Sequence, residues 1–222
     1  MSQGSLSVVP MFATPLGVVT LPTAMSDLTP AVAQLLARHA AANPAPVGSD
    51  RLCYQSREDL LEWSAEPIQQ LCESILRGIW STVAAVTTLS PDQLQTLSMQ
   101  ARGRFTIVQP DGCLPAISHS LTAWAGIYCL QAPAPTPQRS DSGVVRFYES
   151  RLGTMLADAT TSAMRIPFTT GHYTWRAVPG QLVVFPGSLT HEIPLIRSVS
   201  PFTLITVRTR FVGPGQEGME RW

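Results

Sequence analysis

Apolar positions recur with two different periods along this chain, which predicts helices in its first part and strands in its second. Between residues 60 and 79, apolar side chains come three and four positions apart, the spacing of a helix that packs one face on a core. Ser56 can cap the start of this helix, and Pro67 is expected to split or kink it. Further capping residues predict a first helix after Ser26 or Thr29, with Pro30 in its first turn, and another helix after Ser90.

From Arg104 onward the pattern changes to short runs that alternate or are rich in β-branched and aromatic residues, which is typical of strands. Strands are expected from Arg104 and in residues 114–132, 143–148, 164–168, 172–178, 181–185 and 200–211, with an opening strand pair in residues 8–21. Helices followed by about seven or eight strands predict an α+β fold with an antiparallel sandwich or jelly-roll barrel.

Length and composition fit a single domain over residues 1–222. N-terminal strands and helices are expected in residues 1–103, the β-barrel core in 104–212 and a C-terminal tail in 213–222. Apolar residues make up 45% of the chain and charged residues 14%, so a sizeable hydrophobic core can form.

The charge pattern limits the partners. The formal net charge is zero and no basic patch stands out, which argues against nucleic acid and anionic membranes. No apolar run approaches the roughly 20 residues of a membrane span, and no signal-peptide pattern opens the chain, so a soluble, cytoplasmic protein is expected. The apolar run in residues 8–21 could pair with a second subunit in a homodimer, or it could close the outer edge of the barrel.

The strongest candidates for chemistry are His119 and His191, each at the start of a predicted strand. In a small barrel two such histidines can converge at one mouth and bind iron or another divalent metal. The common iron(II) site adds a carboxylate two residues after the first histidine, because residues two apart on a strand point the same way. Leu121 stands at that position, so no conventional triad is present. The carboxylates that could replace it are Glu192, Asp111 and Asp158.

Arginines on the last predicted strand are the candidates for anion binding. Arg208 and Arg210 lie two residues apart, so their side chains leave the strand on one face. Four further residues are candidates for the substrate pocket, namely Trp124, Tyr128, Arg146 and His172. Each also has a structural interpretation, since the two aromatic residues could belong to the core and the other two to a solvated sheet face.

Four segments in order along the chain carry a family resemblance: M-F-A-T-P-L-G-V-V-T-L-P, Y-Q-S-R-E-D-L-L, I-S-H-S-L-T-A-W-A-G-I-Y-C-L and P-G-Q-L-V-V-F-P-G-S-L-T-H-E-I-P. Together they resemble motifs of the 2-oxoglutarate/iron(II)-dependent oxygenase family, and the last segment is the most specific match. The resemblance implies a double-stranded β-helix with N-terminal helices packed on its sheet. It also implies iron(II) and 2-oxoglutarate as cofactors.

The resemblance extends to single residues. His119 matches the second histidine of the family's H-x-H segment, and His191 matches the distal metal ligand, whereas Ile117 stands where the first histidine would be. The family's arginine for the 2-oxoglutarate carboxylate falls near Pro201, and Arg208 or Arg210 could take its place in a bidentate clamp.

The sequence therefore favours an Fe(II)/2-oxoglutarate-dependent oxygenase-like protein that hydroxylates or oxidises a small molecule or a peptide. One alternative is a non-catalytic barrel that has lost its metal triad and binds a small acid or a protein partner. Another is a cupin-like metal enzyme, such as an isomerase, that uses the same two histidines without 2-oxoglutarate. Iron content separates the first reading from the second, and succinate release separates it from the third.

Overall fold

The structure is a computed structural model that describes residues 13–44, 51–119, 121–134, 141–149, 164 and 171–214. Its helices are α1 (Thr23–Ala42), α2 (Glu66–Val86) and α3 (Pro91–Gln95), with a 3-10 turn η1 (Leu60–Glu62). Its strands are β1 (Gly17–Thr20), β2 (Cys53–Gln55), β3 (Ser98–Val108), β4 (Leu114–Ile117), β5 (Trp124–Gln131), β6 (Val144–Tyr148), β7 (His172–Arg176), β8 (Gln181–Pro186), β9 (His191–Ile193) and β10 (Phe202–Val212).

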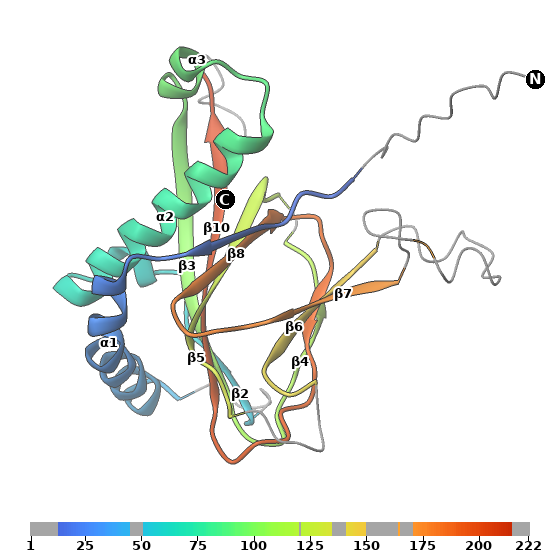
Figure 1. The fold of residues 1–222 in the computed structure, drawn as a ribbon. Coiled ribbons are helices and arrows are strands. Elements are labelled where there is room, and N and C mark those ends of the chain that lie inside the picture. The colour runs from blue at the N-terminus through green and yellow to red at the C-terminus, as the bar shows by residue number, and fades with distance from the viewer. Residues whose placement is uncertain are drawn as a thin grey trace, which may run out of the picture.

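Two antiparallel sheets form the body of the molecule (Figure 1). The larger sheet has the strand order β1-β8-β5-β10-β3-β2, and the smaller has the order β4-β9-β6-β7. Most neighbouring strands are distant in sequence, as where β10 pairs with both β3 and β5, which is the connectivity of a jelly-roll barrel. The predicted α+β fold, a double-stranded β-helix with N-terminal helices packed on the sheet, is confirmed.

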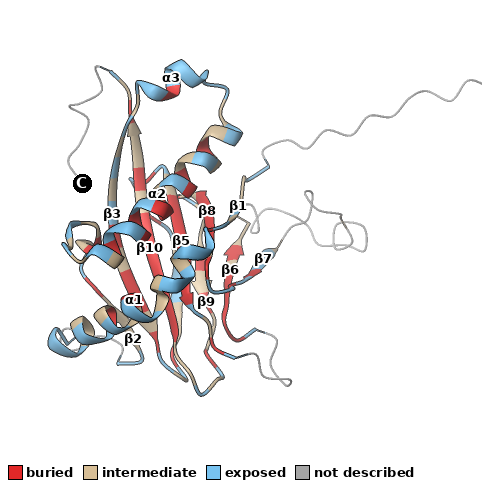
Figure 2. Ribbon diagram, turned by 60° about the vertical axis from the view of Figure 1, so that its left-hand side comes forward, coloured by how far each residue is buried: buried red, intermediate tan, exposed pale blue. Residues whose placement is uncertain are grey.

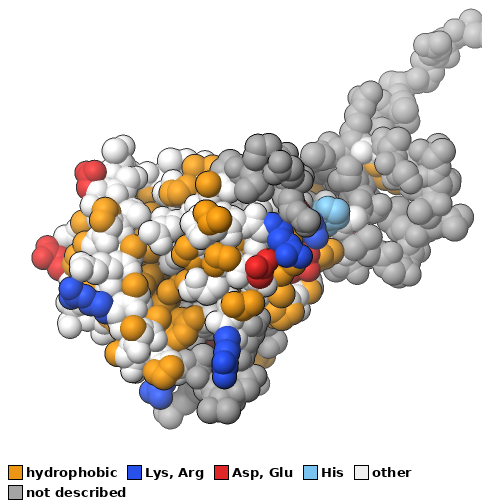
Figure 3. Space-filling view, turned by 90° about the horizontal axis from the view of Figure 1, so that it is seen from below, with side chains coloured by type: hydrophobic (Ala, Val, Ile, Leu, Met, Phe, Trp, Pro, Cys, Tyr) orange, Lys and Arg blue, Asp and Glu red, His pale blue; other side chains and the backbone are white. Residues whose placement is uncertain are grey.

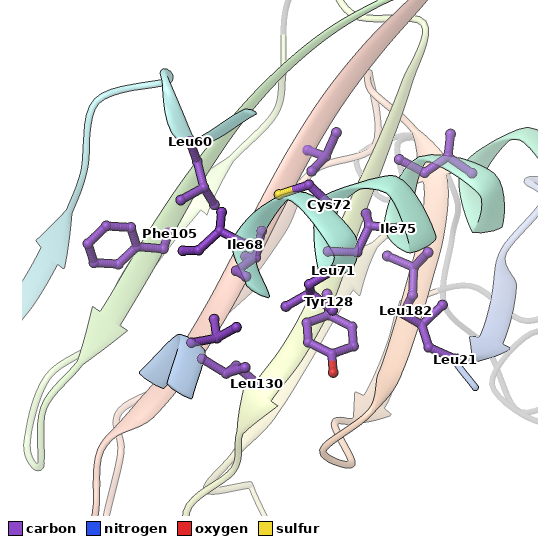
Figure 4. Packing of buried hydrophobic residues seen from close by; sticks show 14 of the residues in the cluster. Leu21, Leu60, Ile68, Leu71, Cys72, Ile75, Phe105, Tyr128, Leu130 and Leu182 are labelled. Carbon is purple, nitrogen blue, oxygen red and sulfur yellow. The ribbon is translucent and has the colours of Figure 1, made fainter. Parts of the chain in front are cut away.

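Helices α1 and α2 cover the face of the larger sheet that is turned away from the smaller sheet (Figure 1). The predicted apolar stripe lies on α2, where Leu71, Ile75 and Ile79 are almost fully buried. Figure 4 shows Leu71 and Ile75 close to Tyr128 of β5 and Leu182 of β8. Burying each such aliphatic side chain contributes about 1.5–3 kcal/mol, so this helix anchors one side of the sheet. Figure 2 shows the buried residues on the strands beneath it.

The second core cluster fills the space between the two sheets. Ile127, Val183 and Phe185 from the larger sheet meet Val145 and Phe147 from the smaller one. Along β10 the side chains alternate, since Ile205 and Val207 belong to the helix-side cluster and Leu204 belongs to this inner one. The same alternation turns the side chain of Arg208 toward the inside of the barrel.

Three local predictions need correction or extension. Helix α1 begins at Thr23, so Pro30 lies inside the helix rather than in its first turn. Ser56 caps no helix, because its hydroxyl accepts a hydrogen bond from the Phe105 backbone N–H at 3.1 Å. Helix α2 starts at Glu66 with Pro67 in its first turn, so the expected split falls just before this proline.

Of the remaining boundaries, the start of α3 agrees with the sequence, whereas β3 begins at Ser98 rather than at the predicted Arg104. Ser90 caps α3 in a capping box with Gln93, as its position before a proline predicted. Of the opening strand pair, the described part contains β1, and residues 165–168 of another expected strand lie outside the described residues. The short strand β9 was not predicted as a separate element. None of the described helices is long and apolar enough to cross a membrane.

Candidate metal and anion site

His119 and His191 meet between the two sheets, as the sequence predicted for residues at one barrel mouth. Their ring centroids are 5.1 Å apart, and the two residues are only 5% and 1% exposed. Phe185 lies against the His191 ring at a centroid distance of 5.1 Å, and Phe147 lies at 5.9 Å. The two imidazoles are thus buried side by side, with the His191 ring against two phenylalanine rings.

Backbone contacts hold the two histidines in register. The backbone N–H of His119 donates to the carbonyl oxygen of Gly187 at 2.8 Å, which joins the residues after β4 to the loop between β8 and β9 that leads to His191. A Cβ atom at Gly187 would come within 2.5 Å of the Thr122 carbonyl oxygen, so only glycine permits this close approach. Ile117 pairs directly with His191 across β4 and β9, so an isoleucine occupies the place beside His191 that the family resemblance gives to a histidine.

Both imidazoles are held in the neutral form. Burial lowers the pKa of His119 to about 3, and the charges of His191, Arg104 and Arg208 lower it further. Burial also lowers the pKa of His191 to about 4, against the opposing effect of a hydrogen bond to Leu189. Neutral imidazole is the form that ligates metals, so both rings are ready to act as nitrogen donors at neutral pH.

The ring nitrogens are arranged for an external partner. Nδ1 of His191 lies 3.3 Å from the Leu189 carbonyl oxygen, so an Nδ1–H donor there leaves the Nε2 lone pair available. Nε2 of His119 is buried and has no hydrogen-bond partner. A buried nitrogen without a partner is costly in a folded protein, and a bound group that accepts its lone pair or proton would remove this cost.

Among the described residues, no third ligand completes the pair. Leu121 adopts a left-handed backbone conformation with φ of 58°, and its side chain is 69% exposed, so it points away from the histidines. Glu192 lies on the outer face and pairs with Arg146 at 2.8 Å, and Asp111 pairs with Arg197 at 2.8 Å. Asp158 lies outside the described residues. Within the part of the chain that is described, no group of three His, Cys, Asp or Glu side chains could hold a metal ion.

A cluster of charged residues lies next to the histidine pair. Arg104 on β3 and Arg208 on β10 face the inside of the barrel, and Glu58 reaches them from the segment that follows β2. The Glu58 carboxylate accepts a short hydrogen bond from Arg208, and it lies 3.8 Å from Nη1 of Arg104. Burial lowers the pKa of Arg104, and the charge of Arg208 lowers it further, while Glu58 opposes both effects.

The predicted anion-binding residues differ in position. Arg208 belongs to this charged cluster, whereas Arg210 lines a surface cavity of about 310 Å³ together with Leu121, Thr122, Ala123 and Phe211. Arg104 and Glu58 were not singled out from the sequence. The only available signal for Arg104 was its alternation with Arg102 at the start of a strand, which does not distinguish an inner arginine from an outer one.

The four predicted pocket residues lie away from the histidines. Tyr128 is fully buried in the helix-side cluster, and Trp124 packs against the same cluster. Arg146 pairs with Glu192 on the outer face of the smaller sheet. His172 is an exposed residue of β7 at a ring distance of 6.2 Å from Tyr148. On the face drawn in Figure 3, the coloured charged side chains are few and of both signs.

No family model and no curated protein matches this sequence. Solved structures do match. A Pseudomonas putida prolyl-4-hydroxylase aligns with a TM-score of 0.56 and 17% identity over 89% of this chain and 92% of that one. SnoN, a non-heme alpha ketoglutarate dependent epimerase from nogalamycin biosynthesis, aligns with a TM-score of 0.59 and 11% identity over 95% of this chain and 86% of that one. A third match is a prolyl hydroxylase from Trichoplax adhaerens in complex with a peptide fragment of the hypoxia inducible factor oxygen degradation domain. It aligns with a TM-score of 0.53 and 9% identity over 87% of this chain and 82% of that one.

The chain has the fold of the 2-oxoglutarate-dependent oxygenases. This agrees with the resemblance of its sequence motifs and with the jelly-roll topology of its two sheets. At such identities the likeness concerns the fold, and the chemistry depends on the residues at the site.

Proposed function

We propose that this protein is a non-haem Fe(II)/2-oxoglutarate-dependent oxygenase that hydroxylates or oxidises a small molecule or a peptide. The observation that carries the proposal is the buried pair of neutral imidazoles at 5.1 Å, one of which has an Nε2 atom without a partner. Such a pair supplies the two nitrogen donors of the two-histidine, one-carboxylate site that is common for iron(II).

The residues present fit iron(II) through two nitrogen donors. His119 and His191 would hold the metal, and 2-oxoglutarate with water or another small ligand would supply the remaining donors. Bound there, iron(II) and 2-oxoglutarate would activate dioxygen, the oxidant that a C–H hydroxylation requires, with 2-oxoglutarate as the source of two of the four electrons that dioxygen takes up. Phe147 and Phe185 would keep the histidine side of the site dry, because both are almost fully buried against His191.

The arginines would bind the carboxylate of the cosubstrate. Arg208 is the better placed of the two predicted residues, since its charge acts on His119 and its side chain faces the barrel interior. Arg210 would contact a part of the ligand nearer the surface, beside the cavity that it lines. A peptide substrate is in keeping with the peptide complex of one structural neighbour, and a small molecule with SnoN.

The direct test is an anaerobic titration of metal-free protein with iron(II) and 2-oxoglutarate, followed by the visible charge-transfer band of the chelate. We expect a band that needs both components and disappears in His191→Ala, while the exposed-site control His172→Ala retains it. Absence of the band and of stoichiometric iron in the unmodified protein would contradict the proposal. Arg208→Ala is expected to weaken 2-oxoglutarate binding by about 1.5–3 kcal/mol, as for a lost charge-assisted bond.

A second candidate function is a barrel that binds a small acid without turnover. It is favoured by one observation, the outward side chain of Leu121 at the position where a third ligand would be expected. Succinate release during aerobic incubation with 2-oxoglutarate, iron(II) and candidate substrates separates the two functions. Acid binding without iron uptake would support the second.

A further inference from the structure

Arg104 and Arg208 form a pair of like charges inside the barrel. Arg104 lies opposite Thr206 in the β3–β10 register, and Arg208 follows two residues later, so the two arginines are diagonal neighbours on one face. Side chains in this relation stay within reach of each other, at roughly 7–8 Å between their Cα atoms. Their side chains are only 21% and 20% exposed, so water screens their repulsion weakly.

Glu58 interacts more closely with Arg208 than with Arg104. It makes a close hydrogen-bonded ion pair with Arg208, but its distance of 3.8 Å from Arg104 exceeds that of a hydrogen bond. Nε of Arg104 is buried and has no hydrogen-bond partner. Arg104 therefore retains donor capacity that points to a ligand with oxygen acceptors.

The charges of the cluster do not balance. Two guanidinium groups face one carboxylate, and both neighbouring histidines are neutral, so the group carries a net charge of about +1 in a largely buried place. Glu58 supplies a carboxylate to both arginines, but it makes a hydrogen-bonded pair with Arg208 alone. A second negative group would complete the pairing of Arg104.

We propose that Arg104, Arg208 and Glu58 form a carboxylate-binding subsite beside the histidine pair, in which Glu58 acts as an internal competitor of an acidic ligand. The ligand's carboxylate would bind Arg104 and share Arg208 with Glu58, or displace Glu58 from it. This inference rests on the proposed function in one respect, because that function decides whether the acid is the cosubstrate or the substrate. The binding itself requires no metal.

Glu58 could instead be a purely structural contact. Its segment is already tied to β3, because Ser56 bonds the Phe105 backbone and Asp59 bridges to Gly103. A structural role predicts that loss of the carboxylate lowers stability and leaves the affinity for acids unchanged. A competitor role predicts that the loss increases this affinity.

The experiment measures binding of succinate to the metal-free full chain at low salt by calorimetry, with succinamide as an uncharged probe. Glu58→Gln is expected to bind succinate at least about tenfold more tightly than the unmodified protein, as for one charge-assisted contact that no longer competes. Adding Arg104→Gln to this variant should abolish the gain. The matched control is Glu73→Gln, which removes a carboxylate from the exposed Glu73–Arg77 pair on α2 and should change nothing.

Thermal unfolding gives a second readout. Glu58→Gln should lower Tm, because the two largely buried arginines then lose the Glu58 carboxylate, and acetate should restore Tm in a concentration-dependent way that acetamide does not reproduce. If Glu58→Gln does not fold, Arg104→Gln alone keeps the Glu58–Arg208 pair and should weaken succinate binding about tenfold. An unchanged succinate affinity in Glu58→Gln, or a gain that survives Arg104→Gln, would overturn the proposal.

A third experiment measures 2-oxoglutarate binding, with and without iron(II), and identifies which molecule carries the carboxylate. If iron(II) tightens 2-oxoglutarate binding and Arg104→Gln weakens it, the subsite holds the cosubstrate. If Arg104→Gln weakens succinate binding alone, the subsite holds an acidic substrate. Because the calorimetry is done without metal, failure to bind iron would refute the oxygenase proposal and leave the result for the subsite intact.

Discussion

Acidification should destabilise this protein through its two buried histidines. An imidazole in an unfolded chain has a pKa of about 6.5, whereas the folded-state pKa is lowered to about 3 for His119 and about 4 for His191. The folded state therefore keeps both rings neutral where the unfolded state takes up protons. Stability from this pair is fully present above pH 6.5 and is lost as the pH falls from 6.5 toward the folded-state values.

The size of the loss in unfolding free energy follows from the difference between the solution pH and the pKa of an unfolded imidazole. At pH 5 an unfolded imidazole is about 1.5 pH units below its pKa, and each unit is worth about 1.36 kcal/mol, so each histidine costs about 2 kcal/mol. The folded rings stay almost uncharged at this pH, because both folded-state values lie below it. The pair together lowers the free energy of unfolding by about 4 kcal/mol, a large part of a typical domain's stability.

Urea unfolding at pH 7.5 and pH 5, with a chelator present, measures this loss. Carboxylates also titrate in this range, so the informative quantity is the change in the pH difference when a histidine is removed. His191→Gln should reduce that difference by about 2 kcal/mol, and the double variant with His119→Gln by about 4 kcal/mol. A pH difference that is the same in both variants and the unmodified protein would show that the folded rings accept protons, and it would refute the burial argument.

Three further substitutions test the neighbourhood of the pair. Leu121→Gly should stabilise the fold by about 0.5–1 kcal/mol, since glycine tolerates the left-handed backbone at φ 58°, and a loss of stability in urea unfolding would contradict this. Leu121→Asp should leave iron(II) uptake unchanged because the side chain faces solvent, and tighter uptake would show that the segment can turn inward. Gly187→Ala should cost about 1–3 kcal/mol through a clash with the Thr122 carbonyl oxygen and weaken iron binding, whereas unchanged unfolding and uptake would show that the loop yields.

Much of the fold could be predicted because local and tertiary preferences agree. The capping box at Ser90 and the apolar stripe of α2 depend on short-range patterns, and both lie where the sequence placed them. Pro30 illustrates the opposite case. The sequence offered Ser26 and Thr29 as caps, but the helix starts earlier, at Thr23, and accommodates the proline, because Met25 and Leu28 in its first turns pack against the helix-side core.

The candidate site could be predicted only in part. Placing two histidines at strand starts was enough to bring His119 and His191 together. A helix capped by Ser56, as the sequence predicted, would place Glu58 in its first turn. Instead the Ser56 hydroxyl accepts a hydrogen bond from the backbone of a distant strand, which brings Glu58 to the arginines. Such a contact depends on the tertiary fold, and a pattern of neighbouring residues contains no signal for it.

The histidines and the arginines should act on each other through charge. The charges of Arg104 and Arg208 lower the pKa of His119, which means that they oppose any added positive charge there, a bound metal ion included. A carboxylate on the arginines would cancel that effect, so an acid and a metal should each tighten the binding of the other by the same factor. Succinate cannot chelate through a 2-oxo group, so it tests the electrostatic part alone. Saturating succinate should increase the iron(II) affinity of the unmodified protein about fivefold or more, and this gain should vanish in Arg104→Gln. An iron affinity that succinate leaves unchanged would mean that the two sites are electrostatically independent.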